Sequence, residues 1–160
     1  MLTITIIAVG RLKDGFYEDA AAEYGKRLGA YCKLNTVEIR AAELPEDPGA
    51  ALVSDALKRE GQEILKKIPA AAYVAALCIE GKQITSEDMG ALLTDVPLTG
   101  KSELVFIIGG SYGLSDEVKK RADARLSMSR MTFPHRLARV MLLEQIYRGF
   151  KIARGEKYHK

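Results

Sequence analysis

The stretch LVFIIGGSYGLSDEV, residues 104–118, decides the fold of this chain. Its five leading apolar residues are typical of a strand buried on both faces, and they stop at a glycine pair, Gly109 and Gly110. A few residues later, Ser115 stands before two carboxylates, which is the pattern of a helix start. The stretch therefore predicts a strand, a glycine turn and a helix in succession.

The same alternation of strand and helix runs along the whole chain. Gly29 is expected to close the first helix and Ser54 to be the N-cap of the second. Strands are expected at 2–10, 34–40, 73–79, 103–109 and 125–129, and helices at 16–29, 54–68, 86–96, 115–124 and 135–152. We predict one α/β domain over residues 1–160, with a mostly parallel sheet and helices on both faces.

The glycine turn does not match the common phosphate-binding patterns. Its glycines do not fit G-x-G-x-x-G, and no lysine stands where a P-loop needs one. Asp116 and Glu117 at the helix start would also repel a phosphate. The turn suits either a neutral or cationic ligand or nothing more than a tight bend. S-adenosylmethionine, a sulfonium cation without phosphate, is a ligand of that kind.

The position of this turn indicates where a ligand would bind. Ligands of open α/β sheets bind at the carboxyl ends of the strands. Leu77 lies near the end of the third expected strand, Gly109 ends the fourth, and MSRMTF (128–133) leaves the fifth. These three strand ends form the predicted binding edge.

Charge is distributed unevenly along the chain. Residues 119–160 hold twelve Lys and Arg against three Asp and Glu, a net charge of +9. The first 118 residues hold twelve basic and eighteen acidic residues, a net charge of −6. This basic quarter favours an anionic partner, and a solvated surface without a partner is the alternative.

The last expected helix carries an arginine, Arg139, inside its apolar face. A buried guanidinium needs a partner, so Arg139 is either in a structural pair with a carboxylate or held at a functional site or subunit interface. The helix is apolar nearly all round, which favours a homodimer. His135 at its start is either a cap or a catalyst, and the tail EKYHK has residue types that contact RNA.

The cysteines and the N-terminus favour a reduced, cytoplasmic protein. Cys32 and Cys78 lie far apart and form no CxxC motif. The first ten residues, MLTITIIAVG, lack a basic segment and a cleavage site, so they are expected to form a strand and not a signal peptide. No apolar run approaches the roughly 20 residues that span a bilayer.

Four segments together closely resemble one known family, and they cover essentially the whole chain. They are ITIIAVGRLKDGFYEDAAAEYGKRLGAY, FIIGGSYGLSDEV, LSMSRMTFPHRLARVMLLEQIYRGFKI and RGEKYHK. The family is the bacterial ribosomal RNA large-subunit methyltransferase H family, in the knotted SPOUT superfamily.

This resemblance implies a C-terminal trefoil knot, a homodimer with each pocket near the partner subunit, and S-adenosylmethionine as cofactor, with no metal. The implied reaction methylates N3 of a pseudouridine in 23S ribosomal RNA of the assembled ribosome. Carried over by motif, the cofactor residues are Leu77, Gly109, Met128, Ser129, Arg130, Met131, Thr132 and Phe133. The catalytic candidates are Arg139, Arg148, Tyr158, His159 and His135. The competing interpretations are a non-catalytic ribosome-binding or RNA-binding module and, already disfavoured by the turn, a nucleotide-dependent enzyme.

Overall fold

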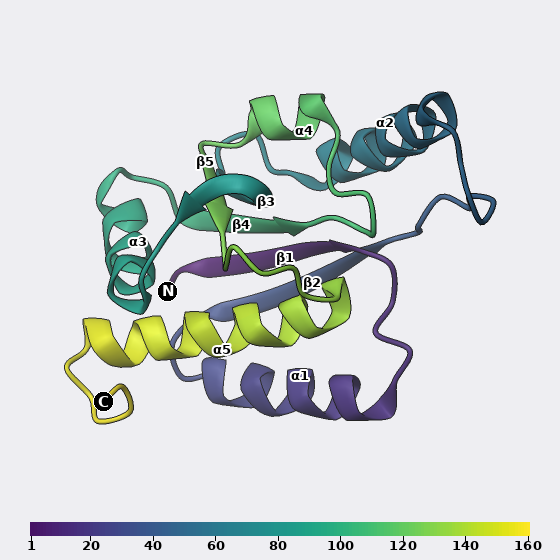
Figure 1. Ribbon diagram of the computed structural model, residues 1–160. Coiled ribbons are helices and arrows are strands. Elements are labelled where there is room, and N and C mark those ends of the chain that lie inside the picture. The colour runs from purple at the N-terminus through teal and green to yellow at the C-terminus, as the bar shows by residue number, and fades with distance from the viewer.

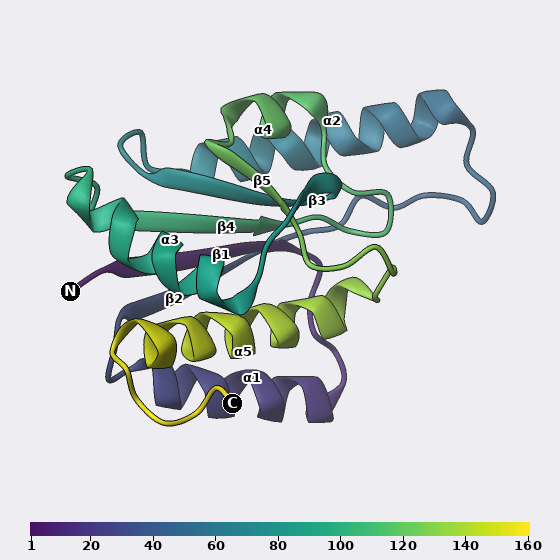
Figure 2. The same ribbon diagram turned by 60° about the vertical axis from the view of Figure 1, so that its left-hand side comes forward.

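A computed structural model describes all residues, 1–160, as a three-layer α/β structure (Figures 1 and 2). The central sheet has five strands in the order β2-β1-β4-β3-β5, and every pair is parallel. The strands are β1 (Thr3–Val9), β2 (Lys33–Ile39), β3 (Tyr73–Gln83), β4 (Glu103–Ile108) and β5 (Ala124–Ser127). The predicted fold class is therefore confirmed, and the trefoil knot stays a prediction.

Five helices cover the two faces of the sheet. On one face lie α1 (Gly15–Leu28), α3 (Ser86–Leu98) and α5 (His135–Ala153); on the other lie α2 (Ala50–Lys67) and α4 (Asp116–Arg121). The apolar run of β4 serves both faces: Leu104 and Phe106 pack towards α5, while Val105 and Ile107 pack towards α2. Burial on both sides explains why this strand is continuously apolar.

Several predicted boundaries were wrong, and one of them is the end of helix α4, which stops at Arg121 and not at residue 124. Helix α2 begins at Ala50 after the N-cap Gly49, so Ser54 lies inside the helix and is not its N-cap. Helix α3 continues through Pro97 to Leu98, although proline has no N–H to donate to the preceding turn. Strand β3 continues to Gln83, because its polar end pairs with β5.

Strand β3 bows outward in its second half. Leu77 and Lys82 are both paired with Leu126 of β5, so residues 78–81 form a bulge. A side chain at Gly81 would overlap the backbone of Leu126, so glycine allows this close approach. Pairing between β3 and β4 ends at Ala76, and the two strands separate beyond it. The sheet is therefore open at its carboxyl edge, next to the bulge.

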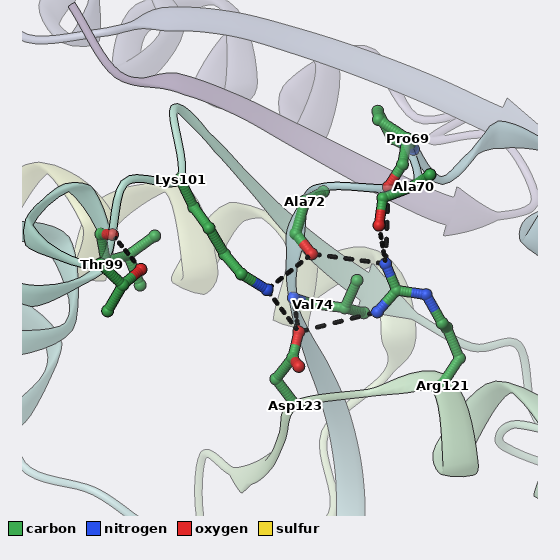
Figure 3. A network of polar contacts seen from close by, with 9 residues as sticks. Pro69, Ala70, Ala72, Val74, Thr99, Lys101, Arg121 and Asp123 are labelled. Carbon is green, nitrogen blue, oxygen red and sulfur yellow. Dashed lines mark hydrogen bonds and ion pairs between the residues drawn. The ribbon is translucent and has the colours of Figure 1, made fainter.

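A polar network anchors the opposite end of β3 (Figure 3). One carboxylate oxygen of Asp123 accepts the N–H of Val74 at 2.8 Å, and the N–H of Asp123 donates to the carbonyl of Val74 at 2.8 Å. Arg121 donates to the carbonyls of Pro69, Ala70 and Ala72 at 3.3 to 3.4 Å. These bonds hold the segment between α4 and β5 on β3 and so fix where β5 begins.

Candidate active site

A cavity of about 800 Å³ lies at the carboxyl ends of β3, β4 and β5. Its walls come from the β3 bulge, the glycine turn after β4, the segment between β5 and α5, and the start of α5. The lining residues are Leu77, Cys78, Ile79, Glu80, Ile108, Gly109, Gly110, Ser111, Tyr112, Gly113, Leu114, Lys119, Leu126, Ser127, Met128, Ser129, Met131, Thr132, Phe133, Pro134, His135 and Ala138.

The glycine turn presents bare backbone to this cavity. The N–H of Gly113 donates to the carbonyl of Gly110 at 3.1 Å. Gly113 has a φ of +84°, a backbone conformation that favours glycine. A Cβ on Gly109 would overlap the carbonyl of Gly113, so the turn closes only around glycine. The Ser115 hydroxyl then caps α4 by accepting the N–H of Val118 at 3.3 Å, as the sequence predicted.

Seven of the eight residues that the resemblance assigned to the cofactor line this cavity. They are Leu77, Gly109, Met128, Ser129, Met131, Thr132 and Phe133. The exception is Arg130, which is exposed and lies outside the lining. The neighbouring backbone is held by two bonds of 3.0 Å: the Ser127 hydroxyl donates to the Ser129 carbonyl, and the Met131 N–H donates to the Ser129 hydroxyl.

His135 is the one predicted catalytic candidate that lines the cavity. Burial lowers the pKa of its imidazole, and the nearby positive charges of Arg136 and Arg139 lower it further. His135 is therefore neutral at pH 7 and able to accept a proton. Its Nε2 also lies 3.8 Å from the position that a Cβ on Gly10 would take.

Arg139, one helical turn further on, is buried in a structural pair. Its Nη1 donates to Glu38 at 2.8 Å, and its Nη2 donates to the carbonyl of Gly10 at 2.9 Å. Its side chain is only 4% exposed and does not line the cavity. Of the two alternatives that the sequence left open, the structure shows the pair with a carboxylate.

The other three catalytic candidates gather at the far end of α5. Arg148 donates to Glu144 at 2.6 and 3.0 Å, and the Tyr158 hydroxyl donates to the same carboxylate at 3.2 Å. His159 accepts from Arg148 at 3.2 Å and donates to Glu87 of α3 at 2.9 Å. Burial raises the pKa of the Tyr158 phenol and the Glu144 charge raises it further, so the hydroxyl stays protonated. We call Glu144, Arg148, Tyr158 and His159 the tail cluster.

The tail cluster and the cavity lie towards opposite ends of α5, because His135 at its start lines the cavity and Arg148 lies near its end. Thirteen residues separate Arg148 from His135, which at the rise of an α-helix is about 20 Å. The structure of one chain therefore divides the predicted catalytic residues into His135 at the cavity, buried Arg139, and the tail cluster.

Sequence reasoning missed the acidic partners that hold these residues. Glu144 joins Arg148 to Tyr158, and Glu38 holds Arg139. Inside the cavity, Glu80 forms an ion pair with Lys119. Helical spacing of four residues was a usable signal for Glu144 and Arg148, whereas the other pairs join distant parts of the chain.

Cys32 and Cys78 are free and buried, and burial raises the pKa of Cys32 to about 11. No group of three or more His, Cys, Asp or Glu side chains is placed to hold a metal ion. None of the helices combines the length and the apolar character needed to cross a membrane.

Comparison with known proteins places the chain in a family. A family model described as "Predicted SPOUT methyltransferase" matches residues 2–159. "Ribosomal RNA large subunit methyltransferase H" of Bifidobacterium adolescentis is 52% identical over 99% of this chain and 100% of its own length. Proteins of the same name from Pelotomaculum thermopropionicum and Carboxydothermus hydrogenoformans are 49% and 48% identical, over 99% of this chain and at least 99% of theirs. The chain therefore belongs to the SPOUT methyltransferases and, among them, to the ribosomal RNA large subunit methyltransferase H family.

Proposed function

We propose that this protein transfers a methyl group from S-adenosylmethionine to N3 of a pseudouridine in 23S ribosomal RNA of the assembled ribosome, as a cytoplasmic homodimer. The observation that carries the proposal is the convergence of seven of the eight expected cofactor residues on one cavity of about 800 Å³. A module that only binds RNA does not need such a cavity at its sheet edge.

The cavity fits a cofactor without phosphate. Its volume lies within the range of about 300 to 1,000 Å³ usual for small-molecule sites. The one lysine that lines it, Lys119, is neutralised by Glu80. The adjoining start of α4 carries Asp116 and Glu117, which would repel a phosphate. Residues 128–133 would hold the adenosyl part between backbone and apolar side chains.

The chain's own residues would prepare the nucleophile. When bound, S-adenosylmethionine supplies an electrophilic methyl group. The N3 of pseudouridine is protonated at neutral pH, so the site must favour loss of that proton. Neutral His135 is the group in the cavity suited to accept it, directly or through water. The cavity walls contribute by positioning the two reactants.

The tail cluster argues for the homodimer. The Tyr158 hydroxyl bonds to Glu144 and His159 bonds to Arg148, which lie nine and thirteen residues along α5 from His135, or about 14 and 20 Å. In this arrangement Tyr158 and His159 lie away from the cavity of their own chain, and a second copy would supply them to it. The sites would then lie between subunits, each with the cavity of one chain and the tail of the other.

Methyl transfer to purified ribosomes tests this function. Labelled S-adenosylmethionine is incubated with the protein and either assembled ribosomes or isolated large subunits, and the modified nucleotide is located by mass spectrometry. We expect one methyl group on N3 of one pseudouridine, with assembled ribosomes preferred. Ribosome binding without methyl transfer, together with no heat on titration with S-adenosylmethionine, would leave the RNA-binding module as the function.

A further inference from the structure

A second, smaller pocket adjoins the cavity. It has a volume of about 250 Å³ and shares four lining residues with the cavity: Gly110, Ser111, Tyr112 and His135. Its other walls come from β1, from the segment after β2 and from α2. They are Val9, Ala41, Ala42, Leu44, Val53, Ala56, Leu57 and Glu60. The glycine turn and the proposed proton acceptor therefore lie at the junction of the two pockets.

Glu60 is the only charged side chain that lines this pocket, because the imidazole of His135 is neutral. Its Oε2 accepts the N–H of Ala42 at 2.8 Å, which fixes the carboxylate in place. Its Oε1 has no hydrogen-bond partner in the chain and is not sealed from solvent. Burial raises the pKa of Glu60, which reflects how poorly the carboxylate is hydrated. The pocket thus offers mostly apolar walls and, in Oε1 of Glu60, a carboxylate oxygen free to accept a hydrogen bond.

We propose that this pocket receives the target base itself, and that Oε1 of Glu60 accepts the N1–H of pseudouridine. This inference rests on the proposed function and adds the element of the site that distinguishes pseudouridine from uridine. Pseudouridine is joined to its ribose through C5, so N1 carries a hydrogen. Uridine is joined through N1 and has only a C–H at the corresponding position.

The arrangement of atoms around the ring is compatible with both compartments. N1 and N3 flank the C2 carbonyl, so they point in directions about 120° apart. N1–H can face Glu60 while N3 points through the junction of the two pockets, beside the shared residues, towards the methyl group in the cavity. A carboxylate at N3 would block the approach of the methyl group, whereas one at N1 leaves it open. Tyr112, an aromatic side chain about half exposed on this wall, is available to stack on the ring.

The expected consequence is discrimination between the two bases. With uridine, the ring would cover Oε1 and place a C–H group against it, so the carboxylate would lose water without gaining a donor. A hydrogen bond to a charged acceptor predicts a preference for pseudouridine of roughly ten- to hundredfold in kcat/KM. Glu60 acts here as a specificity residue, not as the proton acceptor of the reaction.

The test compares ribosomes carrying pseudouridine or uridine at the target position, with wild type, Glu60→Gln and Glu63→Gln. In Glu60→Gln, the amide oxygen still accepts the Ala42 N–H, while the amide NH₂ takes the place of Oε1. We expect the preference to fall to within about threefold in Glu60→Gln. Glu63→Gln, which removes an exposed carboxylate of α2 outside the pocket, is expected to keep the wild-type ratio.

A second variant guards against a folding defect in Glu60→Gln. Val53→Phe fills the pocket from α2 and is expected to lower methyl transfer at least tenfold while S-adenosylmethionine binding by calorimetry is unchanged. A wild-type ratio in Glu60→Gln, or an equal loss on both substrates, overturns the inference and leaves the proposed function standing. Absence of methyl transfer by wild type would overturn the proposed function instead, and this inference with it.

Discussion

Two adjacent glycines in the turn after β4 have different structural roles. A Cβ on Gly109 would overlap the carbonyl oxygen of Gly113, which belongs to the backbone and cannot swing aside. A Cβ on Gly110 would meet only Val9 Cγ1, at 3.4 Å, an ordinary contact. The closure of the turn therefore depends on Gly109, although both residues line the cavity.

This difference predicts that alanine at Gly109 is damaging, whereas alanine at Gly110 is tolerated. Gly109→Ala should open the turn, lower the free energy of unfolding by about 1–3 kcal/mol and weaken S-adenosylmethionine binding. Gly110→Ala should change stability by less than about 0.5 kcal/mol and keep cofactor binding. Urea denaturation and calorimetry measure both quantities, and equal effects of the two variants would contradict the geometry.

The protonation of His135 is expected to make the stability of the folded chain depend on pH. Its pKa in the folded chain is lowered, chiefly by burial, below the ordinary value of about 6.5. The unfolded chain therefore binds a proton at higher pH than the folded chain does. The stability that neutral His135 provides is complete above about pH 6.5 and is lost as pH falls through the lowered pKa.

His135→Gln should flatten the part of the stability profile that this proton controls. Between about pH 5 and 7, the free energy of unfolding of wild type should fall more steeply with decreasing pH than that of the variant. Urea denaturation at several pH values provides the comparison. Parallel profiles would show that His135 binds protons equally in both states.

At the scale of single residues, the sequence indicated which buried side chain needs an interaction partner, but not which residue is that partner. It showed that Arg139 would be buried and require a partner, and the partner is Glu38, 101 residues away. No local pattern connects two such positions, because only the packing of α5 against the sheet brings them together. Arg130 shows a second limit of the sequence: it belongs to the segment that lines the cavity, but its side chain is exposed to solvent.

At the scale of elements, the sequence predicted the type and order of the helices and strands well, but predicted where they end poorly. The buried strands and helix α2 are strongly patterned, and all ten elements are present in the predicted order. The end of β3, residues 79–83, is polar and exposed at most positions, so hydrophobicity could not indicate that it pairs with β5. That bulge nevertheless provides one wall of the cavity.

Helices α3 and α5 cross where two glycines meet. A Cβ on Gly149 would lie 2.9 Å from Leu93 Cδ1, 3.0 Å from Met89 Cγ and 3.2 Å from the backbone nitrogen of Gly90. The two helices approach closely because neither glycine has a side chain. This crossing also fixes the end of α5 that carries the tail cluster.

Gly149→Val should force the two helices apart and lower stability by about 1–3 kcal/mol. The matched control is Ala153→Val, in the last turn of the same helix, where the side chain is exposed and little change is expected. Thermal denaturation followed by circular dichroism distinguishes them. Similar melting temperatures for the two variants would mean that the crossing has room for a side chain.

At the scale of the molecule, half of the positive charge in the C-terminal quarter is neutralised within the fold. Six of its twelve cations form ion pairs: Lys119, Arg121, Arg136, Arg139, Arg148 and Lys151. Three of their partners, Asp14, Glu38 and Glu80, come from the acidic first 118 residues. The six cations without a carboxylate partner are Lys120, Arg125, Arg130, Arg154, Lys157 and Lys160. Charge counted along the sequence therefore overstated the surface free to meet RNA.

The structure also changes the argument for a homodimer. Helix α5 packs between α1 and α3, which accounts for most of its apolar surface, and Leu142 belongs to the core of its own chain. Met141 is only half-buried and lies about two turns before the crossing with α3. We expect Met141→Glu to give folded monomers, because a charge there opposes a second copy without entering the core. Light scattering at micromolar concentration checks this, and a monomeric wild type would contradict it.

The last prediction concerns the tail, which packs on the surface of the fold. None of residues 155–160 is fully buried, although Tyr158 packs edge-on against Tyr147 with ring centroids 4.9 Å apart. Truncation after Arg154 should therefore keep the fold and S-adenosylmethionine binding. It should abolish methyl transfer to ribosomes, because the proposed site takes Tyr158 and His159 from the partner subunit.

Mixed dimers show whether the tail acts across the subunit interface. The truncated chain keeps an intact cavity, and full-length Thr132→Trp, whose new side chain fills the cavity, keeps an intact tail. Each is expected to be inactive alone. A mixed dimer of the two has one complete site, so equal amounts refolded together should recover about a quarter of wild-type activity. If the mixture stays inactive although mixed dimers form, either the tail only docks RNA, or it serves the cavity of its own chain after moving along α5 towards His135.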